Sequence, residues 1–189
     1  PVEELLERSV RADLLVVGAR GTGGFTGLLM GSVSQRLVEM ATVPVAVVRA
    51  GAPVEAGRVV VGYDGSSAAK EALRWAAGEA RARTATLDIV HAWQIPAAAA
   101  SPWVIVPQDQ LTDASREIME EARAEPALEG LAVDAHIHHG SPAEAILERA
   151  EGAQLVVMGT RGMGRLASAL LGSVSRQVLH HTHTPVVVV

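Results

Sequence analysis

Short runs of valine and other β-branched residues alternate along this chain with longer stretches in which small apolar residues recur every three or four positions. The run at 58–64, RVVVGYD, predicts a buried strand that ends in a turn. The segment 68–83 places Ala72, Leu73 and Ala76 on one helical face and predicts an amphipathic helix. A strand followed at once by a helix is typical of α/β folds.

The same alternation continues to the last residue. Further strands are predicted at 85–93, 131–139, 154–159 and 185–189, and further helices at 111–125, 173–181 and after Ser141. Ser141 suits an N-cap, because Pro142 stands at the first helical position and Glu144 at the capping-box position. Several strands are apolar throughout, which indicates a parallel sheet with helices on both faces. We therefore expect a Rossmann-like α/β fold with an open, doubly wound, five-stranded parallel sheet.

The chain also repeats itself at an offset of 141 residues. Residues 1–48 align without a gap to 142–189, and 21 of the 48 pairs are identical. We interpret residues 58–189 as one complete copy of a duplicated domain, and 1–48 as the C-terminal part of a preceding copy whose front is missing. A chain that opens on Pro1 is accordingly not expected to start where the natural protein does. Residues 49–57, rich in Gly, Ala and Pro, are the expected linker.

The missing front would leave the strand at 14–18 with an uncovered edge and uncovered apolar faces. The strand at 44–48 can pair with 185–189, either in the same chain or in another chain. We expect residues 1–48 to dock in this way or else to be poorly ordered, and we expect self-association, as a dimer, through the last strand.

Composition narrows the possible partners and compartments. A net charge of −5 and a pI of about 5.8 provide no basic face, so nucleic acid is not expected. The absence of cysteine excludes disulfides and thiol catalysis and agrees with the reducing cytoplasm. The apolar runs are far shorter than the roughly 20 residues that span a bilayer. No signal peptide is expected, because the start has neither a basic region nor an initiator methionine. We therefore expect no membrane partner.

Candidate chemistry lies in two glycine-rich segments, 159–175 (GTRGMGRLASALLGSVS) and 18–34 (GARGTGGFTGLLMGSVS), which share the spacing G-x2-G-x9-G-S. Gly162 permits a positive φ or a close backbone approach, and the pair Gly172–Ser173 opens a helix. Free N–H groups at such a helix start favour an anion, most simply a phosphate chain. A single glycine would more often only turn the chain, but the same spacing after two strands favours binding.

This pattern resembles the ATP-binding branch of the universal stress protein family, whose signature is G-x2-G-x9-G-[ST]. The resemblance runs from VVVGYDGS through HGSPAEAIL and MGTRGMG to GSVS, and it extends to residues 1–48. It implies an adenine nucleotide alpha hydrolase-like fold, a tandem member with a truncated first domain, and ATP as the ligand, with or without Mg²⁺.

The resemblance also implies roles for individual residues. Asp64 would face the nucleoside, and the main chain of Ala92, next to His91, would contact adenine. Ribose and phosphates would be held by Gly159, Gly162, Gly172 and Ser173, with Val174 and Ser175 completing the cradle. The hydroxyls of Ser173 and Ser175 would act as donors. Arg161 as a phosphate partner is our inference from its charge and reach.

Other motifs are less specific. The segment 162–167 matches G-x-G-x-x-A, but no acidic residue follows about 20 positions later, and neither loop has a Walker A lysine. His136 and His138 share a strand face and would suit a metal ion, yet no third ligand has a telling spacing, so no metal is expected. Asp64 before Gly65 would also suit a simple Asx-turn. Either Trp93 or Trp103 would be able to cover the base.

Together with these patterns, the resemblance implies an adenine-nucleotide-binding stress or regulatory protein in which ATP alters conformation or association. We assign no catalytic residue, because no general base or activated nucleophile is evident near the phosphates, and any hydrolysis would be slow. Two alternatives remain open: an association module of the same fold that needs no nucleotide, and a nucleotide-dependent enzyme.

Overall fold

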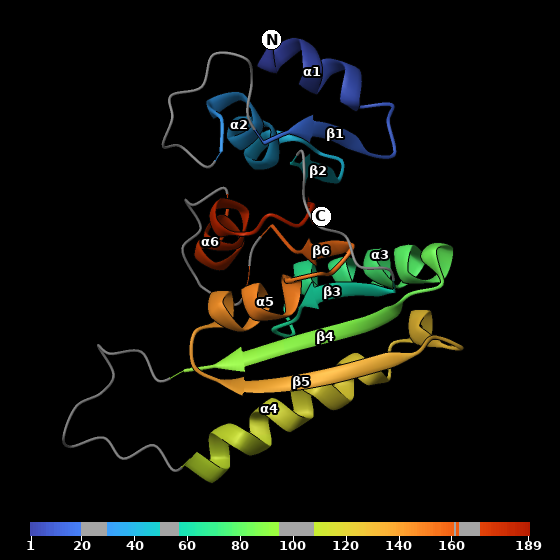
Figure 1. The fold of residues 1–189 in the computed structure, drawn as a ribbon, viewed down its shortest axis with the longest axis vertical. Coiled ribbons are helices and arrows are strands. Elements are labelled where there is room, and N and C mark those ends of the chain that lie inside the picture. The colour runs from blue at the N-terminus through green and yellow to red at the C-terminus, as the bar shows by residue number, and fades with distance from the viewer. Residues whose placement is uncertain (20–29, 50–56, 95–107, 161, 163–170) are drawn as a thin grey trace, which may run out of the picture.

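The structure, a computed structural model, describes residues 1–19, 30–49, 57–94, 108–160, 162 and 171–189 (Figure 1). The helices are α1 (Val2–Ser9), α2 (Ser32–Met40), α3 (Ser67–Arg83), α4 (Gln108–Arg123), α5 (Pro142–Ala150) and α6 (Ser173–His181), with a 3-10 turn, η2, at Pro126–Leu128. The strands are β1 (Leu15–Gly18), β2 (Val45–Val48), β3 (Arg58–Gly62), β4 (Thr86–Trp93), β5 (Val133–His139), β6 (Leu155–Met158) and β7 (Val186–Val188).

These strands form one sheet in the order β1-β2-β7-β6-β3-β4-β5. The five strands of residues 58–189 are parallel and doubly wound, which confirms the expected fold class. The sheet as a whole has seven strands rather than five, because β2 pairs antiparallel with β7, Ala46 opposite Val187. The predicted docking of 44–48 against 185–189 therefore occurs within one chain, and β7 is an inner strand. Both edges of β7 are therefore paired within the chain, which rules out the alternative that 185–189 pairs with another chain, and self-association of the protein stays a prediction.

The strands that lead into the two glycine-rich segments make equivalent backbone hydrogen bonds. The N–H of Leu15 donates to the carbonyl of Pro44 at 2.9 Å, and 141 residues later that of Val156 donates to Pro185 at 2.9 Å. In both segments Oγ of a serine returns to the carbonyl that ends the strand: Ser34 to Gly18 at 2.7 Å, and Ser175 to Gly159 at 2.9 Å. At these positions the two repeated segments therefore make equivalent hydrogen bonds.

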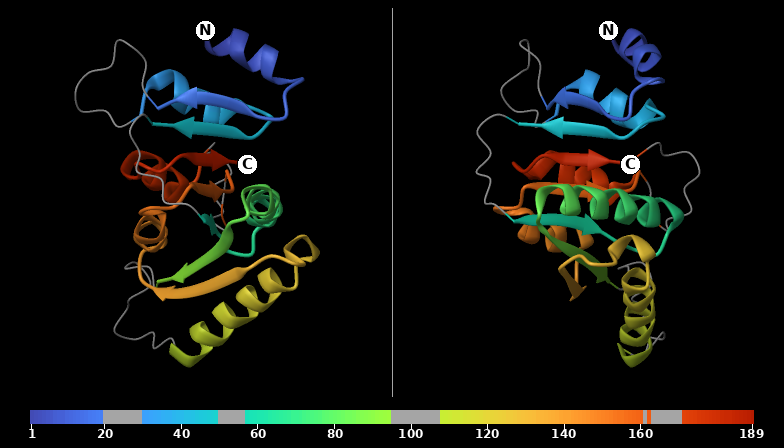
Figure 2. Two further views of the ribbon diagram at one scale, coloured as in Figure 1. Left: turned by 45° about the vertical axis from the view of Figure 1, so that its right-hand side comes forward. Right: turned by 90° about the vertical axis from the view of Figure 1, so that its right-hand side faces the viewer.

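Helices cover both faces of the sheet. The cluster around α3 and α4 buries one side of β4 through Leu87 and Ile89, while the cluster around α2, α5 and α6 buries Val90 on the other side. Figure 2 shows α3 and α5 on opposite sides of the sheet. The alanine-rich face of α3 is completely buried because small side chains allow the helix to pack closely on the sheet. Within the described ranges no helix is both long and apolar enough to cross a bilayer.

Strand β1 is an edge of the sheet, and one of its faces is open. Val16 is 57% exposed, whereas its equivalent at the offset of 141 residues, Val157, is fully buried in the cluster that includes α3. Leu15 and Val17 point to the opposite face and pack against the other cluster. The uncovered edge that was expected for this strand is therefore present among the described residues, but only one of its faces is open, because the core cluster covers the other.

Candidate functional site

The strand order reverses between β3 and β6, and most of the expected site residues gather at the carboxyl ends of these two strands. From β3 the chain enters α3 on one face of the sheet, and from β6 it leads to α6 on the other face. Ligands of open α/β sheets bind in the crevice that such a reversal creates.

Asp64 follows β3 and contacts Gly162 from the loop after β6. Its Oδ1 accepts a hydrogen bond from the N–H of Ser66 at 3.0 Å, and Gly65 has φ 83°, so the Asx-turn is present. Its Oδ2 lies so close to Gly162 that a Cβ at that position would collide with it. Gly162 is not among the described glycines with a positive φ, so close approach explains this glycine.

Gly159 directly follows β6 and contacts the first turn of α3. A Cβ on Gly159 would lie 2.8 Å from the carbonyl carbon of Ala68 and 2.9 Å from its Cβ and its oxygen. The carbonyl of Gly159 accepts from Oγ of Ser175, which is buried. The hydroxyl proton that we expected Ser175 to offer to a phosphate is thus already bonded within the loop.

The N-terminus of α6 has no side-chain cap. Its N-cap is Gly172, whose N–H donates to the carbonyl of Thr160 at 2.8 Å. Helices α3 and α5 differ, since Oγ of Ser66 and Oγ of Ser141 each accept from the backbone three residues later, as predicted for Ser141. The first N–H groups of α6 therefore lack the partner that a polar N-cap would supply, and such groups favour an anion. Ser173 here is exposed and Val174 half-buried.

The remaining predicted residues lie on the neighbouring strand β4 or outside the described part. Ala92 is half-buried near the carboxyl end of β4, the neighbour of β3. The ring of Trp93 lies against His139, with 4.4 Å between ring centroids. Arg161 and Trp103 fall outside the described residues, as does most of the expected linker 49–57.

One buried chain of hydrogen bonds behind the site was missed by the sequence reasoning. His91 on β4 has Nδ1 2.9 Å from the carbonyl oxygen of Tyr63 and Nε2 3.3 Å from Oγ of Ser115 on α4. His91 is 4% exposed and Ser115 2%. The available signal was a single histidine inside the otherwise apolar run DIVHAW, which we noted only as the neighbour of Ala92.

A cluster of charged side chains lies elsewhere on the sheet, around Asp88. Its Oδ2 is 3.6 Å from Nε2 of His136 and 4.0 Å from nitrogens of Arg58 and Arg149, beside a hollow of about 310 Å³. Burial raises the pKa of Asp88, while burial and then Arg149 lower the pKa of His136. Within the described residues no three His, Cys, Asp or Glu side chains group in a way that could hold a metal ion.

This cluster makes stability depend on pH. Because the pKa of His136 is lower in the folded protein than its ordinary value of 6.5, the unfolded chain binds protons more readily, and stability falls as the pH drops below about 6.5. We expect His136→Gln to lose less stability between pH 7.5 and 5.5 than the parent in urea denaturation. The exposed His183→Gln serves as a control that should follow the parent, and equal losses in all three proteins would contradict this.

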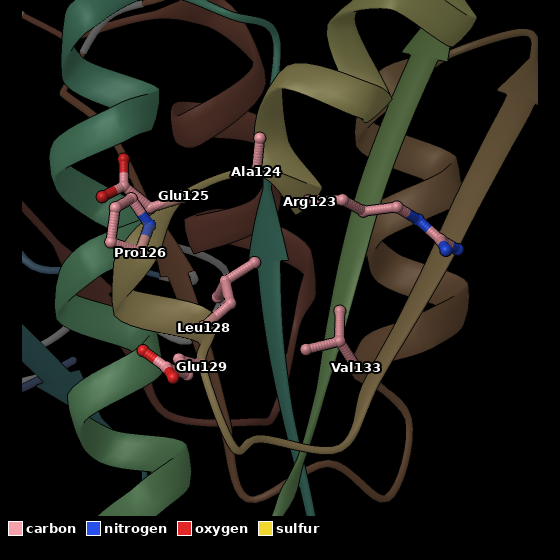
Figure 3. A pocket seen from close by; sticks show the side chains of 7 residues that line it. All are labelled: Arg123, Ala124, Glu125, Pro126, Leu128, Glu129 and Val133. Atoms are coloured by element: carbon pink, nitrogen blue, oxygen red, sulfur yellow. The ribbon is translucent and has the colours of Figure 1, made fainter.

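A larger hollow of about 420 Å³ lies where α4 ends and β5 begins (Figure 3). It is lined by Arg123, Ala124, Glu125, Pro126, Leu128, Glu129 and Val133. Glu125 already accepts from Arg74 at 3.1 Å, and no predicted site residue borders this hollow. It opens at the amino end of β5, away from the reversal between β3 and β6.

Comparisons with known proteins agree on one family. The profile described as "Universal stress protein family" matches residues 1–49 and 55–189. A universal stress protein of Mycobacterium tuberculosis is 35% identical over 193 residues, covering 99% of this chain and 64% of the relative. The structure of a universal stress protein from Archaeoglobus fulgidus has 31% identity and a TM-score of 0.68, covering 100% of this chain and 64% of that chain.

A universal stress protein in complex with cAMP is also similar, with 29% identity and a TM-score of 0.54 over 70% of this chain and 96% of that chain. The present chain spans just under two thirds of the M. tuberculosis relative, since it covers 64% of that length.

Proposed function

This chain belongs to the universal stress protein family, and we propose that it binds an adenine nucleotide, ATP in particular, at the carboxyl ends of β3 and β6. Nucleotide binding would then act through conformation or association, as expected for a stress-response regulator. Residues 1–48 would be the C-terminal part of a first domain, and a cytoplasmic location would suit the cysteine-free sequence.

The observation that carries this proposal is that Asp64 contacts Gly162, while the start of α6 is hydrogen-bonded to Thr160 of the same loop. A carboxylate suits the hydroxyl groups of a ribose, because it accepts hydrogen bonds. The uncapped N–H groups of Ser173 and Val174 suit phosphate oxygens. Gly159 and Gly162 allow the loop after β6 to approach α3 and Asp64 closely. The relative with bound cAMP supports an adenine nucleotide rather than another anion.

The other assigned groups would complete the site. The main chain of Ala92 would contact adenine, and Arg161 would pair with a phosphate. Ser175 would contribute its backbone N–H, since its hydroxyl donates to Gly159. Asp64 is the carboxylate that this site contributes, so any Mg²⁺ would be held mainly by phosphate oxygens.

Binding without efficient turnover fits the described side chains best. Both ring nitrogens of His91 have hydrogen-bond partners, and one oxygen of Asp64 is bonded to the N–H of Ser66. His91 is therefore not poised to deprotonate a water molecule, and in the proposed site Asp64 would be engaged by the ribose. The alternative of a nucleotide-independent association module has one observation in its favour, which is the open face of β1 at Val16.

The proposal is tested by Gly172→Val. The valine side chain would stand where a phosphate must approach backbone N–H groups, so we expect ATP affinity measured by calorimetry to fall about tenfold or more. Gly78→Ala is the matched control, because a Cβ there has no atom within 4 Å and lies on the exposed side of α3. Equal ATP affinity of Gly172→Val and the parent would contradict the phosphate assignment.

A further inference from the structure

His91 connects three elements behind the proposed nucleotide site. It lies on β4, and its imidazole reaches the carbonyl of Tyr63 at the end of β3 and the hydroxyl of Ser115 on α4. Burial of this ring and of Ser115 excludes direct contact with solvent. Two polar groups that are buried together must satisfy one another, because an unpaired buried donor or acceptor is costly.

The partners determine the tautomer of the ring. A carbonyl oxygen can only accept, so Nδ1 of His91 must carry the proton that it donates to Tyr63. In the neutral ring Nε2 is then an acceptor, and the hydroxyl of Ser115 donates to it at 3.3 Å. Ser115 thus favours the tautomer that the bond to Tyr63 requires.

The bond to Tyr63 determines the direction of the peptide that carries Asp64. The carbonyl of Tyr63 and the N–H of Asp64 belong to the same planar peptide group. The N–H of Tyr63 is also bonded to β4, donating to the carbonyl of Val90 at 2.9 Å. With both polar backbone groups of Tyr63 attached to β4, Asp64 starts from a defined backbone position and reaches both Ser66 and Gly162.

We infer that His91 is a positioning residue for nucleotide binding: its Nδ1–H orients Asp64 through the Tyr63 carbonyl, and Ser115 holds the ring in the required tautomer. The inference rests on the proposed function, since Asp64 is the group through which His91 acts. It also makes α4 part of the site, because the hydroxyl of Ser115 belongs to that helix.

Two variants whose side chains resemble each other in shape distinguish a positioning role of His91 from a role in packing alone. In His91→Asn the side-chain amide can place an N–H near the position of Nδ1. The leucine side chain of His91→Leu has nearly the same shape as that of asparagine but no hydrogen-bond donor. A purely structural histidine predicts that Leu, the more apolar replacement, is tolerated at least as well. The positioning role predicts the reverse order for ATP affinity, with Asn within about twofold of the parent and Leu about tenfold weaker.

The experiment combines calorimetry with amide exchange. ATP affinity is measured for both variants with Asp64 present and in the Asp64→Ala background, where the difference between Asn and Leu should vanish if His91 acts through Asp64. Amide exchange of the protein without nucleotide reports the bond from the Ser66 N–H to Asp64. We expect protection of this amide to survive in His91→Asn and to fall in His91→Leu.

The possible failures are distinguishable. If the parent binds ATP but Asn and Leu are equal, or their difference persists without Asp64, the inference about His91 is wrong. If the parent does not bind ATP, the proposed function fails, and Ser66 exchange alone then decides whether His91 positions Asp64. Equal Ser66 protection in His91→Asn and His91→Leu would overturn the inference in either case.

Discussion

Gly162→Ala is expected to weaken ATP binding by about ten- to a hundredfold, the equivalent of losing one or two charge-assisted hydrogen bonds. The reason is the contact between Gly162 and Oδ2 of Asp64, which leaves no room for a Cβ. The carboxylate would have to rotate away, and its other oxygen would lose alignment with the N–H of Ser66. Calorimetric titration with ATP measures the effect.

The double variant with Asp64→Ala is the control for this prediction. Asp64→Ala alone should weaken binding by the value of one polar contact, about 0.5–3 kcal/mol. With the carboxylate absent, the added methyl group of Gly162→Ala has nothing to displace, so the double variant should bind ATP like Asp64→Ala. Full affinity of Gly162→Ala in the presence of Asp64 would show that this contact is irrelevant to binding.

Gly159→Ala is expected to lower the free energy of unfolding by about 1–3 kcal/mol, the usual range for overpacking a buried position. The new Cβ would meet backbone atoms of Ala68 at 2.8–2.9 Å, and backbone in the first turn of a packed helix cannot move aside as a flexible side chain can. Either β6 or α3 must therefore shift. Chemical denaturation of both proteins measures the difference.

Gly78→Ala, in the helix that Gly159 contacts, is expected to have the opposite effect on stability. Gly78 lies inside α3 with open space around its missing Cβ, so alanine should raise stability by up to about 1 kcal/mol through helix propensity. If Gly159→Ala were as stable as the parent while Gly78→Ala behaved as expected, the close approach of Gly159 to Ala68 would not be needed for stability.

Local patterns predict most of the helices and strands. The helix at 173–181 agrees with α6 at both ends, and the cap at Ser141 is present, because caps and periodic apolar positions depend on neighbouring residues. Helix α4 begins at Gln108 rather than at 111, and the turn η2 was not predicted. Ends without a strong capping residue carry little local information.

The pairing of β2 with β7 could be predicted only in part from the repeat, and the tertiary structure decided the rest. The repeat identified two equivalent strands, 44–48 and 185–189, but it left open whether they would pair in one chain or between chains. The antiparallel pairing of Ala46 with Val187 decided this within the chain and extended the sheet to seven strands. Strand pairing depends on which edges are free after the domain has folded, and a local sequence pattern does not contain this information.

For the site, the sequence by itself determined the two glycine segments, the turn at Asp64 and the helix start at Gly172, since each depends on a few consecutive residues. Only the tertiary structure decided that Asp64 meets Gly162, that Gly159 rests on Ala68, and that His91 supports the peptide before Asp64. These contacts join residues far apart in the chain. They exist because the strand order reverses between β3 and β6 and α4 packs on β4, so they follow from the folded arrangement rather than from any local spacing.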